Sequence, residues 1–176
     1  MDAPSDAMLP EEVLWLEGGQ RYCVCAFYTA NYLPQIMSLK ASVEALGLNH
    51  YFKRYEARGG WEANTRIKAE FVAHALQRLP KHDVVYLDAD AVVRAPLSLF
   101  DEPHADVIML FDHRRIRKLN VLRIAAGTLL VRNSDGGRSF AILWAAEAAR
   151  AGPLDLDEDL IYRMFPKLEG DRKSVV

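Results

Sequence analysis

The chain has 176 residues, of which 51% are hydrophobic and 26% are charged, and its formal net charge is −2. This length suits a single domain, residues 1–176, whose hydrophobic core needs no disulfides. The near-neutral charge excludes a disordered, highly charged tail and argues against nucleic acid as a partner. There is no apolar run of about 18 residues, no basic and apolar leader and no glycosylation sequon, so we expect no membrane span and a cytoplasmic protein.

The first half of the chain predicts alternating strands and helices. After an N-terminal arm at residues 1–19, an apolar and aromatic run at 21–29 predicts a buried strand, whose Cys23 and Cys25 we expect to be unpaired core thiols. Start signals at Asn31 and Pro34 predict a helix that ends at Gly47, followed by a strand at 48–55. Apolar residues at helical spacing then predict a helix capped by Asn64 or Thr65 and ended by Pro80.

The second half continues this alternation. Residues 83–87 form a continuous apolar run, which is typical of a central parallel strand covered on both faces, and 107–111 and 128–131 repeat the pattern. Helices are predicted at 139–149 and 158–165, before a tail at 166–176. The sequence therefore predicts an α/β sandwich of Rossmann type, with a mostly parallel central sheet, helices on both faces and ligands beyond the carboxyl ends of the strands.

The motif with the clearest chemistry is Asp88-Ala89-Asp90, at the end of the apolar run. Two extended residues apart, both carboxylates are expected to share one face, and Ala89 leaves room for a ligand. Paired carboxylates favour Mn²⁺ or Mg²⁺ over zinc, and such an ion can stabilise the charge of a departing diphosphate. Taken alone, the same triplet also fits a solvated turn after a strand.

In this context the chain resembles the nucleotide-diphospho-sugar transferases (glycosyltransferases) of GT-A fold, over about residues 21–165. The resemblance rests on motifs in order: Phe27-Tyr28-Thr29-Ala30-Asn31-Tyr32, Asn64-Thr65-Arg66-Ile67-Lys68-Ala69-Glu70-Phe71, Tyr86-Leu87-Asp88-Ala89-Asp90, Ala126-Gly127-Thr128-Leu129-Leu130 and Asp157-Glu158-Asp159-Leu160. It implies a GT-A-like domain that binds a nucleoside-diphosphate sugar with Mn²⁺ or Mg²⁺ and transfers the sugar to an unknown acceptor. Its C-terminal part is short relative to the family.

The resemblance also implies roles for individual residues. Asp90 would bind the metal directly, and Asp88 would contact the metal, the ribose or both. Lys68 and Asp157 are the catalytic candidates: Lys68 would pair with phosphate or with carboxylates of the pocket, and Asp157 would position or deprotonate the acceptor hydroxyl. A solvated helix lysine and an ordinary acidic helix start remain the alternatives for these two. The donor pocket would be lined by Phe27, Tyr28, Thr29, Tyr32, Lys68, Asp88 and Ala89, with Gly127 and Thr128 on the acceptor side.

Two other functions remain open. Many GT-A enzymes complete the metal site with a late histidine, but no histidine follows His113, which leaves room for a non-catalytic nucleotide-sugar-binding module. Asp88 also fits the nucleophile of haloacid-dehalogenase-like phosphatases. His113 begins a basic run that includes Arg117 and Lys118, for which we expect a solvated loop, and Trp61 fits either a stacking platform or a loop anchor.

Overall fold

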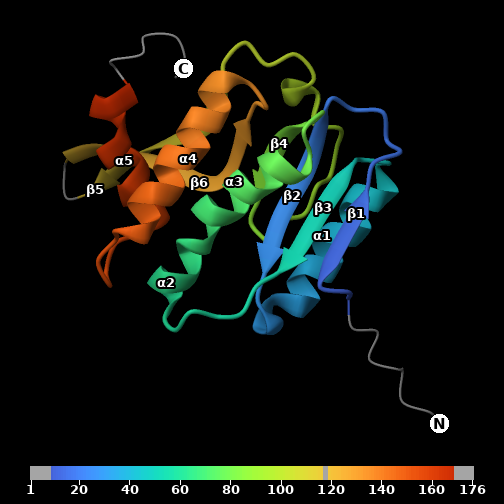
Figure 1. Cartoon of the computed structure of the whole chain (residues 1–176), viewed down its shortest axis with the longest axis horizontal. Helices are drawn as coiled ribbons and strands as arrows, with labels where there is room; N and C mark the ends of the chain where they lie inside the picture. Colours follow the sequence, from blue (N-terminus) through green and yellow to red (C-terminus); the bar gives the residue numbers. More distant parts are fainter. Residues whose placement is uncertain (1–8, 117–118, 169–176) are drawn as a thin grey trace.

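The computed structural model describes residues 9–116 and 119–168, and it contains one six-stranded sheet in the order β1-β3-β2-β4-β6-β5 (Figure 1). The strands are β1 (Glu12–Trp15), β2 (Tyr22–Tyr28), β3 (His50–Arg54), β4 (Asp83–Leu87), β5 (Val107–Ile116) and β6 (Leu119–Val131). The helices are α1 (Leu33–Ala45), α2 (Trp61–Thr65), α3 (Ile67–Arg78), α4 (Asp135–Ala149) and α5 (Asp157–Leu168), with 3-10 turns η1 (Ala30–Tyr32) and η2 (Ser98–Phe100).

Four of the six strands, β3, β2, β4 and β5, run in the same direction, which confirms the mostly parallel α/β sheet. The two others are antiparallel to their neighbours. The edge strand β1 pairs with β3, and β6 lies between β4 and β5. The parallel part of the sheet is therefore the central trio β3-β2-β4, and both β2 and β4 consist almost entirely of buried residues.

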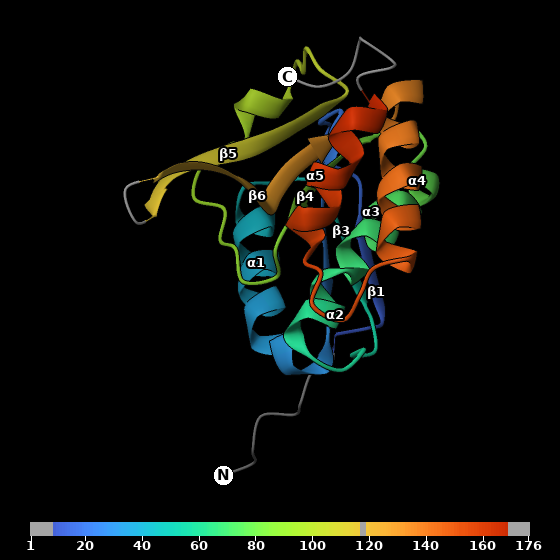
Figure 2. The same cartoon turned by 90° about the vertical axis from the view of Figure 1, so that its left-hand side faces the viewer.

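Helices cover both faces of this sheet. Figure 2 shows α1 on one side and α3 and α4 on the other. Alternate residues of the strands divide between two cores: Cys25, Tyr86 and Leu129 pack toward α3, α4 and α5, and Val24 and Val85 pack toward α1. This alternation is the period of two expected of a strand that is covered on both faces.

The order of the strands reverses between β2 and β4. From β2 the chain crosses through α1 to β3, and then returns through α2 and α3 to β4 on the other side of β2. In open α/β sheets, the crevice beyond the carboxyl ends of the strands at such a point is where ligands bind. Thr29 follows β2 there and Asp88 follows β4, so two of the predicted site residues meet at this point.

Three predictions about local structure are wrong. The run at 128–131 is the end of the 13-residue strand β6, which is antiparallel to β4, because a short apolar run carries no information about strand direction. Asn64 caps no helix: it lies within α2, whose N-cap is Gly60. Residues 112–116 belong to β5 rather than to a loop; the side chain of His113 is not described, and Arg117 and Lys118 lie outside the described residues.

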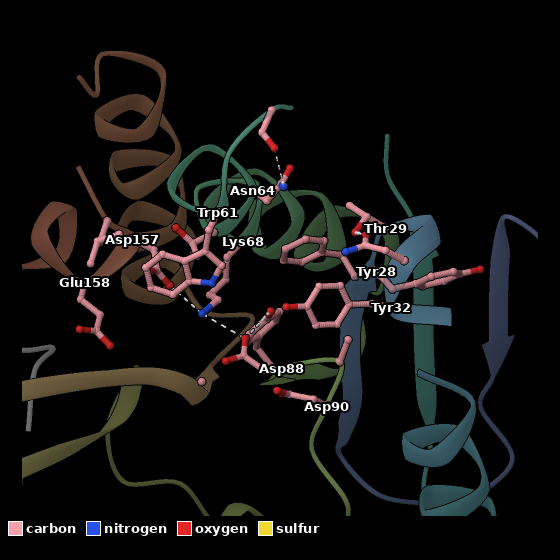
Figure 3. Close-up of a pocket in the computed structure, with 18 residues that line it drawn as sticks. Tyr28, Thr29, Tyr32, Trp61, Asn64, Lys68, Asp88, Asp90, Asp157 and Glu158 are labelled. Carbon is pink, nitrogen blue, oxygen red and sulfur yellow. Dashed lines mark hydrogen bonds and ion pairs between the residues drawn. The ribbon is translucent and has the colours of Figure 1, made fainter. Parts of the chain in front are cut away.

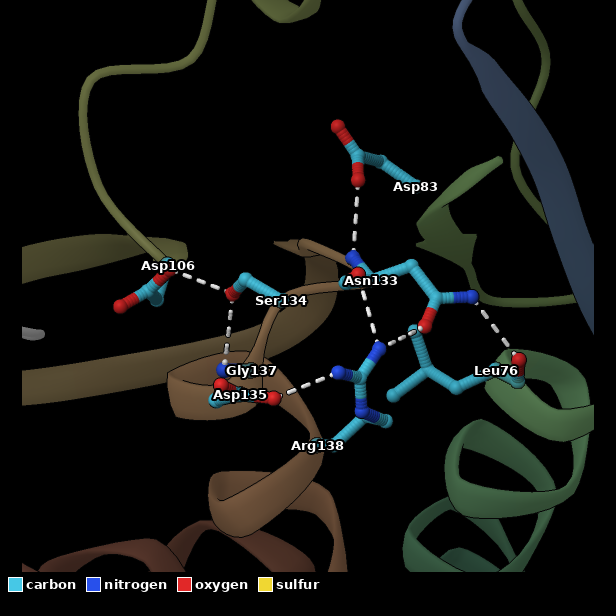
Figure 4. A network of polar contacts seen from close by, with 8 residues as sticks. All are labelled: Leu76, Asp83, Asp106, Asn133, Ser134, Asp135, Gly137 and Arg138. Atoms are coloured by element: carbon cyan, nitrogen blue, oxygen red, sulfur yellow. Dashed lines mark hydrogen bonds and ion pairs between the residues drawn. The ribbon is translucent and has the colours of Figure 1, made fainter. Parts of the chain in front are cut away.

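The position of α4 is fixed by a polar network at its first turn (Figure 4). The N-cap Ser134 accepts a hydrogen bond from Gly137 N at 3.2 Å and donates one to Asp106 at 2.5 Å. Asn133 N donates to Asp83 Oδ1 at 2.8 Å, and its side chain donates to Leu76 O at 2.9 Å. The network joins the start of α4 to α3 and β4, and α4 in turn supports the site through Trp144.

Cys23 and Cys25 are free thiols buried in one core, as predicted. In the described part of the chain, no helix is both long and apolar enough to cross a membrane.

Candidate active site

A pocket of about 500 Å³ opens beyond the carboxyl ends of β2 and β4, a volume that suits a nucleotide-sized ligand (Figure 3). The predicted site residues that line it are Phe27, Tyr28, Thr29, Tyr32, Lys68, Asp88, Ala89, Asp90, Gly127 and Asp157. Thr128 is not among them: it is exposed and pairs with Leu87 in the sheet. The remaining lining residues are Asn31, Gly59, Trp61, Asn64, Thr65, Tyr86, Leu156 and Glu158.

Lys68 is the centre of the pocket floor. It lies on α3, is only 5% exposed, and its Nζ contacts Asp157 Oδ2 at 2.6 Å and Asp88 Oδ1 at 3.1 Å. Its Nζ also donates to Ala126 O at 3.1 Å and lies 5.1 Å from the centre of the Tyr86 ring. The alternative of a solvated helix lysine is therefore excluded, and Lys68 connects the end of β4 to the start of α5.

Two opposing influences act on the pKa of Lys68. Burial is the larger single influence and favours the neutral amine, but the charges of Asp157 and Asp88 together outweigh it, so the pKa of Lys68 lies above its ordinary value. Burial and the Asp88 carboxylate raise the pKa of Tyr86 well above its usual range. Lys68 is therefore a cation and Tyr86 a neutral hydrogen-bond donor at neutral pH.

The Asp88-Ala89-Asp90 triplet forms a turn rather than an extended segment. Ala91 N donates to Asp88 O at 2.9 Å, and this turn brings both carboxylates to the pocket. Asp88 N donates to Gly127 O at 3.0 Å, and Tyr86 OH donates to Asp88 Oδ1 at 2.9 Å. Both carboxylates line one pocket, but the extended geometry from which a shared face was predicted is wrong.

Gly127 leaves the space that the Asp88 carboxylate occupies. A Cβ at position 127 would lie 2.7 Å from Asp88 Oδ2, which is shorter than real Cβ atoms tolerate. Because Oδ1 is engaged by Lys68 and Tyr86, Oδ2 is the oxygen without a polar partner among the described residues. Asp90 is exposed. One oxygen of Asp88 and the carboxylate of Asp90 are thus available to a ligand.

The tip of β2 forms the other side of the pocket. Thr29 is buried, its hydroxyl donates to Asn31 Oδ1 at 2.6 Å, and its carbonyl accepts from Tyr32 N at 2.8 Å. Phe27 stacks on Tyr86 with ring centres 6.3 Å apart. The Tyr28 hydroxyl donates to Pro10 O at 3.2 Å, which fixes the orientation of the Tyr28 side chain. The end of β2 therefore holds Thr29 in a fixed position beside the stacked rings of Phe27 and Tyr86.

Asp157, at the start of α5, is held from two directions. Its carbonyl accepts a hydrogen bond from Trp144 Nε1 at 3.3 Å, and its carboxylate pairs with Lys68. The loop before it is tied by Arg66, whose Nη1 donates to Gly152 O at 2.7 Å and to Asp155 O at 2.9 Å. Because the Asp157 carboxylate is buried and paired with Lys68, Asp157 does more than provide a negative charge at the start of a helix.

The pocket's donor atoms fit a hard divalent cation bound together with a phosphate. Its charged lining residues are Lys68 and the carboxylates Asp88, Asp90, Asp157 and Glu158, a formal charge of +1 − 4 = −3. Oxygen ligands suit Mg²⁺ or Mn²⁺. Across residues 9–116 and 119–168, no group of three or more His, Cys, Asp or Glu side chains is placed to hold a metal. A cation at Asp88 and Asp90 would therefore need phosphate oxygens and water as further ligands.

Sequence reasoning missed two residues that the geometry singles out. No role was predicted for Tyr86. It lies two residues before Asp88 and hence on the same face of the strand, so its proximity to Asp88 could have been predicted from the spacing. Arg66 was likewise given no role, because its partners are backbone carbonyls 86 and 89 residues away. Trp61, for which a stacking platform and a loop anchor were the alternatives, is 60% exposed and lines the pocket.

Comparisons with known proteins relate the fold to glycosyltransferases. No protein-family model matches the chain, and no curated protein matches its sequence. Among solved structures, a glycosyltransferase involved in the glycosylation of the major capsid of PBCV-1 superposes with a TM-score of 0.62 at 14% identity, over 88% of this chain and 81% of that one. The apo-form glycosyltransferase GlyE of Streptococcus pneumoniae TIGR4 superposes with a TM-score of 0.53 at 14% identity, over 89% of this chain and 45% of that one. The chain thus shares the fold of these enzymes.

Proposed function

We propose that the chain is a glycosyltransferase of GT-A type, which moves a sugar from a nucleoside-diphosphate sugar to an acceptor with the help of Mn²⁺ or Mg²⁺. The observation that carries the proposal is the pairing of buried Lys68 with Asp88 and Asp157 at the floor of a pocket beyond β2 and β4. The fold shared with two glycosyltransferases supports it.

Different residues of the pocket would bind the nucleoside and the cation. Thr29 and Tyr32, at the tip of β2, would contact the nucleoside, and Asp88 and Asp90 would hold the cation that accompanies the diphosphate. When bound, the cation offsets the negative charge that develops on the diphosphate as the sugar leaves. Lys68 fixes the Asp88 carboxylate and adds a positive charge on the same side.

The transfer itself needs an acceptor hydroxyl close to the anomeric carbon. Its oxygen bonds to that carbon, the bond between the carbon and the diphosphate oxygen breaks, and the electron pair leaves with the nucleoside diphosphate. The hydroxyl proton passes to a carboxylate of the pocket, for which Asp157 and Glu158 are the candidates beside Lys68. The pocket walls position the two reactants and exclude water.

Calorimetry with uridine and guanosine diphosphates, with and without Mn²⁺, tests the donor site. We expect metal-dependent binding of at least one of them, and loss of most of it in Asp90→Asn. The matched control is Asp101→Asn, which removes the same charge from an exposed residue outside the pocket lining. Absence of metal-dependent binding to either nucleotide, or an Asp90→Asn variant with unchanged affinity, would contradict the proposed donor site.

The same protein distinguishes the two rival functions. Phosphate release from an aryl phosphate, together with a phosphorylated Asp88, would indicate a phosphatase instead. Metal-dependent nucleotide binding without any release of sugar from a nucleoside-diphosphate sugar, to acceptor or to water, would indicate a non-catalytic binding module.

A further inference from the structure

Trp61 is an aromatic side chain in an unusual position for its size. It is 60% exposed although it lines the pocket, and among the described residues its indole has neither a ring neighbour nor a hydrogen-bond acceptor. Large exposed aromatic groups at a pocket are typical of ligand contacts, because an indole offers a broad apolar face and one polar N–H.

The segment that carries Trp61 is fixed before any ligand arrives. Arg58 N donates to Asn64 Oδ1 at 2.7 Å, Asn64 Nδ2 donates to Gly59 O at 3.3 Å, and Thr65 donates to Glu62 O at 2.9 Å. Gly59 has a φ of +107°, a conformation that a side chain would strain. These contacts fix the backbone that carries Trp61, so little ordering of the segment is lost when a ligand stacks on the indole.

The indole lies on the α5 side of the pocket. In the view of Figure 3, Trp61, Lys68, Asp157 and Glu158 are drawn on the left and Thr29 and Tyr32 on the right, with Asp88 and Asp90 between them. A diphosphate held at Asp88 and Asp90 with its nucleoside at the tip of β2 would therefore direct its sugar toward Trp61. The extra carboxylates on this side disfavour a second phosphate and favour hydroxyl groups, which donate hydrogen bonds to carboxylate oxygens.

Exposure distinguishes the floor of the pocket from the side on which Trp61 lies. Thr29, Lys68, Tyr86 and Asp157 are each at most 5% exposed and form the interior, whereas Trp61 lies at the open rim. A diphosphate held at Asp88 and Asp90 would lie over these buried groups, so a second substrate that approaches from solvent would meet Trp61. A pyranose ring suits this environment, since its C–H face packs against an indole while its hydroxyls reach polar groups. Asn64, Thr65 and Glu158 are polar residues of the same pocket lining.

We propose that Trp61 is the acceptor platform and that the acceptor is itself a carbohydrate, whose terminal pyranose stacks on the indole beside Glu158. This inference rests on the proposed function, because it takes the donor to lie across Asp88 and Asp90. It assigns the open side of the pocket to a sugar ring rather than to a lipid chain, which would need a continuous apolar groove.

Binding of methyl pyranosides tests the platform directly. With Mn²⁺ and a nucleoside diphosphate present, we would titrate a panel of methyl glucoside, galactoside, mannoside, rhamnoside and N-acetylglucosaminide. The tryptophan emission of the wild type is expected to change with at least one of them. Trp61→Ala is expected to lose that response and to raise the acceptor KM in a transfer assay at least tenfold. Its affinity for the nucleoside diphosphate, which carries no sugar, is expected to stay within twofold of the wild type. Leu99→Ala, which removes an exposed apolar side chain outside the pocket lining, is the control.

Each contrary result has a distinct meaning. If the nucleoside diphosphate binds with metal but no pyranoside changes the emission, the acceptor platform is refuted and the donor site stands. If Trp61→Ala weakens nucleotide binding, the indole contacts the donor, which also refutes the platform. If the wild type binds no nucleotide at all, the proposed function itself fails.

Discussion

Replacing Lys68 with methionine is the most informative perturbation of this structure. Methionine fills nearly the same space, so the variant removes the charge and its hydrogen bonds without opening a large cavity. The Asp157 carboxylate, whose side chain is 8% exposed, would then be buried without its partner. Removing one partner of a buried ion pair costs about 3 to 5 kcal/mol of unfolding free energy. Asp88, at 43% side-chain exposure, remains solvated and adds at most about 1 kcal/mol.

Thermal unfolding measures this cost. For a chain of this size, each kcal/mol shifts the Tm by about 2 to 4 °C, so Lys68→Met is expected to unfold about 6 to 24 °C below the wild type. Lys40→Met is the matched control, because Lys40 makes a partly exposed pair with Glu44 one helical turn away. Such a pair contributes about 0.3 to 0.5 kcal/mol, which corresponds to a shift of at most about 2 °C.

A double variant shows whether the buried charge is the cause. Adding Asp157→Asn to Lys68→Met removes the unpaired carboxylate, so it is expected to recover part of the lost stability, and a double-mutant cycle gives the coupling between the two side chains. The reasoning would be refuted if Lys68→Met and Lys40→Met unfolded at the same temperature. It would also be refuted if Asp157→Asn lowered the Tm of Lys68→Met further.

Three other predictions concern the same region. Gly127→Ala places a Cβ 2.7 Å from Asp88 Oδ2. The metal-dependent affinity for a nucleoside diphosphate, measured by calorimetry, is therefore expected to fall about tenfold, or about 1.4 kcal/mol. The control is Thr128→Ala, which lies outside the pocket lining and should bind as the wild type does. Arg66→Met removes the ties to the loop before Asp157 and is expected to lower kcat for transfer while nucleotide affinity stays unchanged; equal losses in both would contradict a positioning role. The pKa of Lys68 is raised in the folded state, so the contribution of its charge to the free energy of unfolding is complete below the ordinary lysine pKa and is lost as the pH rises through the raised value. The Tm is therefore expected to fall at strongly alkaline pH, and to fall less in Lys68→Met.

The sequence predicted the strands that carry the site because their composition is extreme. The run at 83–87 is apolar after its first residue, Asp83, and is followed by Asp88, a pattern that fits a strand buried on both faces with Asp88 at its carboxyl end. The direction of β6 was not accessible in this way. Its pattern is the same read in either direction, and its pairing with β4 is set by the long hairpin with β5, whose register also shifts between Met109 and Leu110.

The contacts of the site depend on approaches that no local pattern encodes. Lys68 was a candidate only by resemblance, and its partners are Ala126 in β6 and Asp157 at the start of α5, 58 and 89 residues further along the chain. Gly127 and Thr128 were predicted together, but neighbouring residues of a strand point to opposite faces, and only Gly127 lines the pocket. Which residues of a strand face the pocket can be predicted only once the register of the strand is known. The register of β6 is set by its pairing with β4 and β5, which are distant in the sequence or joined to it by a hairpin.

The charge of the pocket gives a reason why donor and metal should bind together. With one lysine and four carboxylates in its lining, the pocket would repel a diphosphate that arrived alone. It would also hold a bare cation weakly, since no third ligand stands beside Asp88 and Asp90 among the described residues. Each ligand supplies what the other lacks, so on the proposed function their binding is strongly coupled. Because such coupling is reciprocal, the factor by which Mn²⁺ raises the affinity for the nucleoside diphosphate must equal the factor by which the nucleotide raises the affinity for Mn²⁺. Two calorimetric titrations in opposite order measure both factors, and a metal that binds equally tightly without nucleotide would show that ligands other than these two carboxylates hold it.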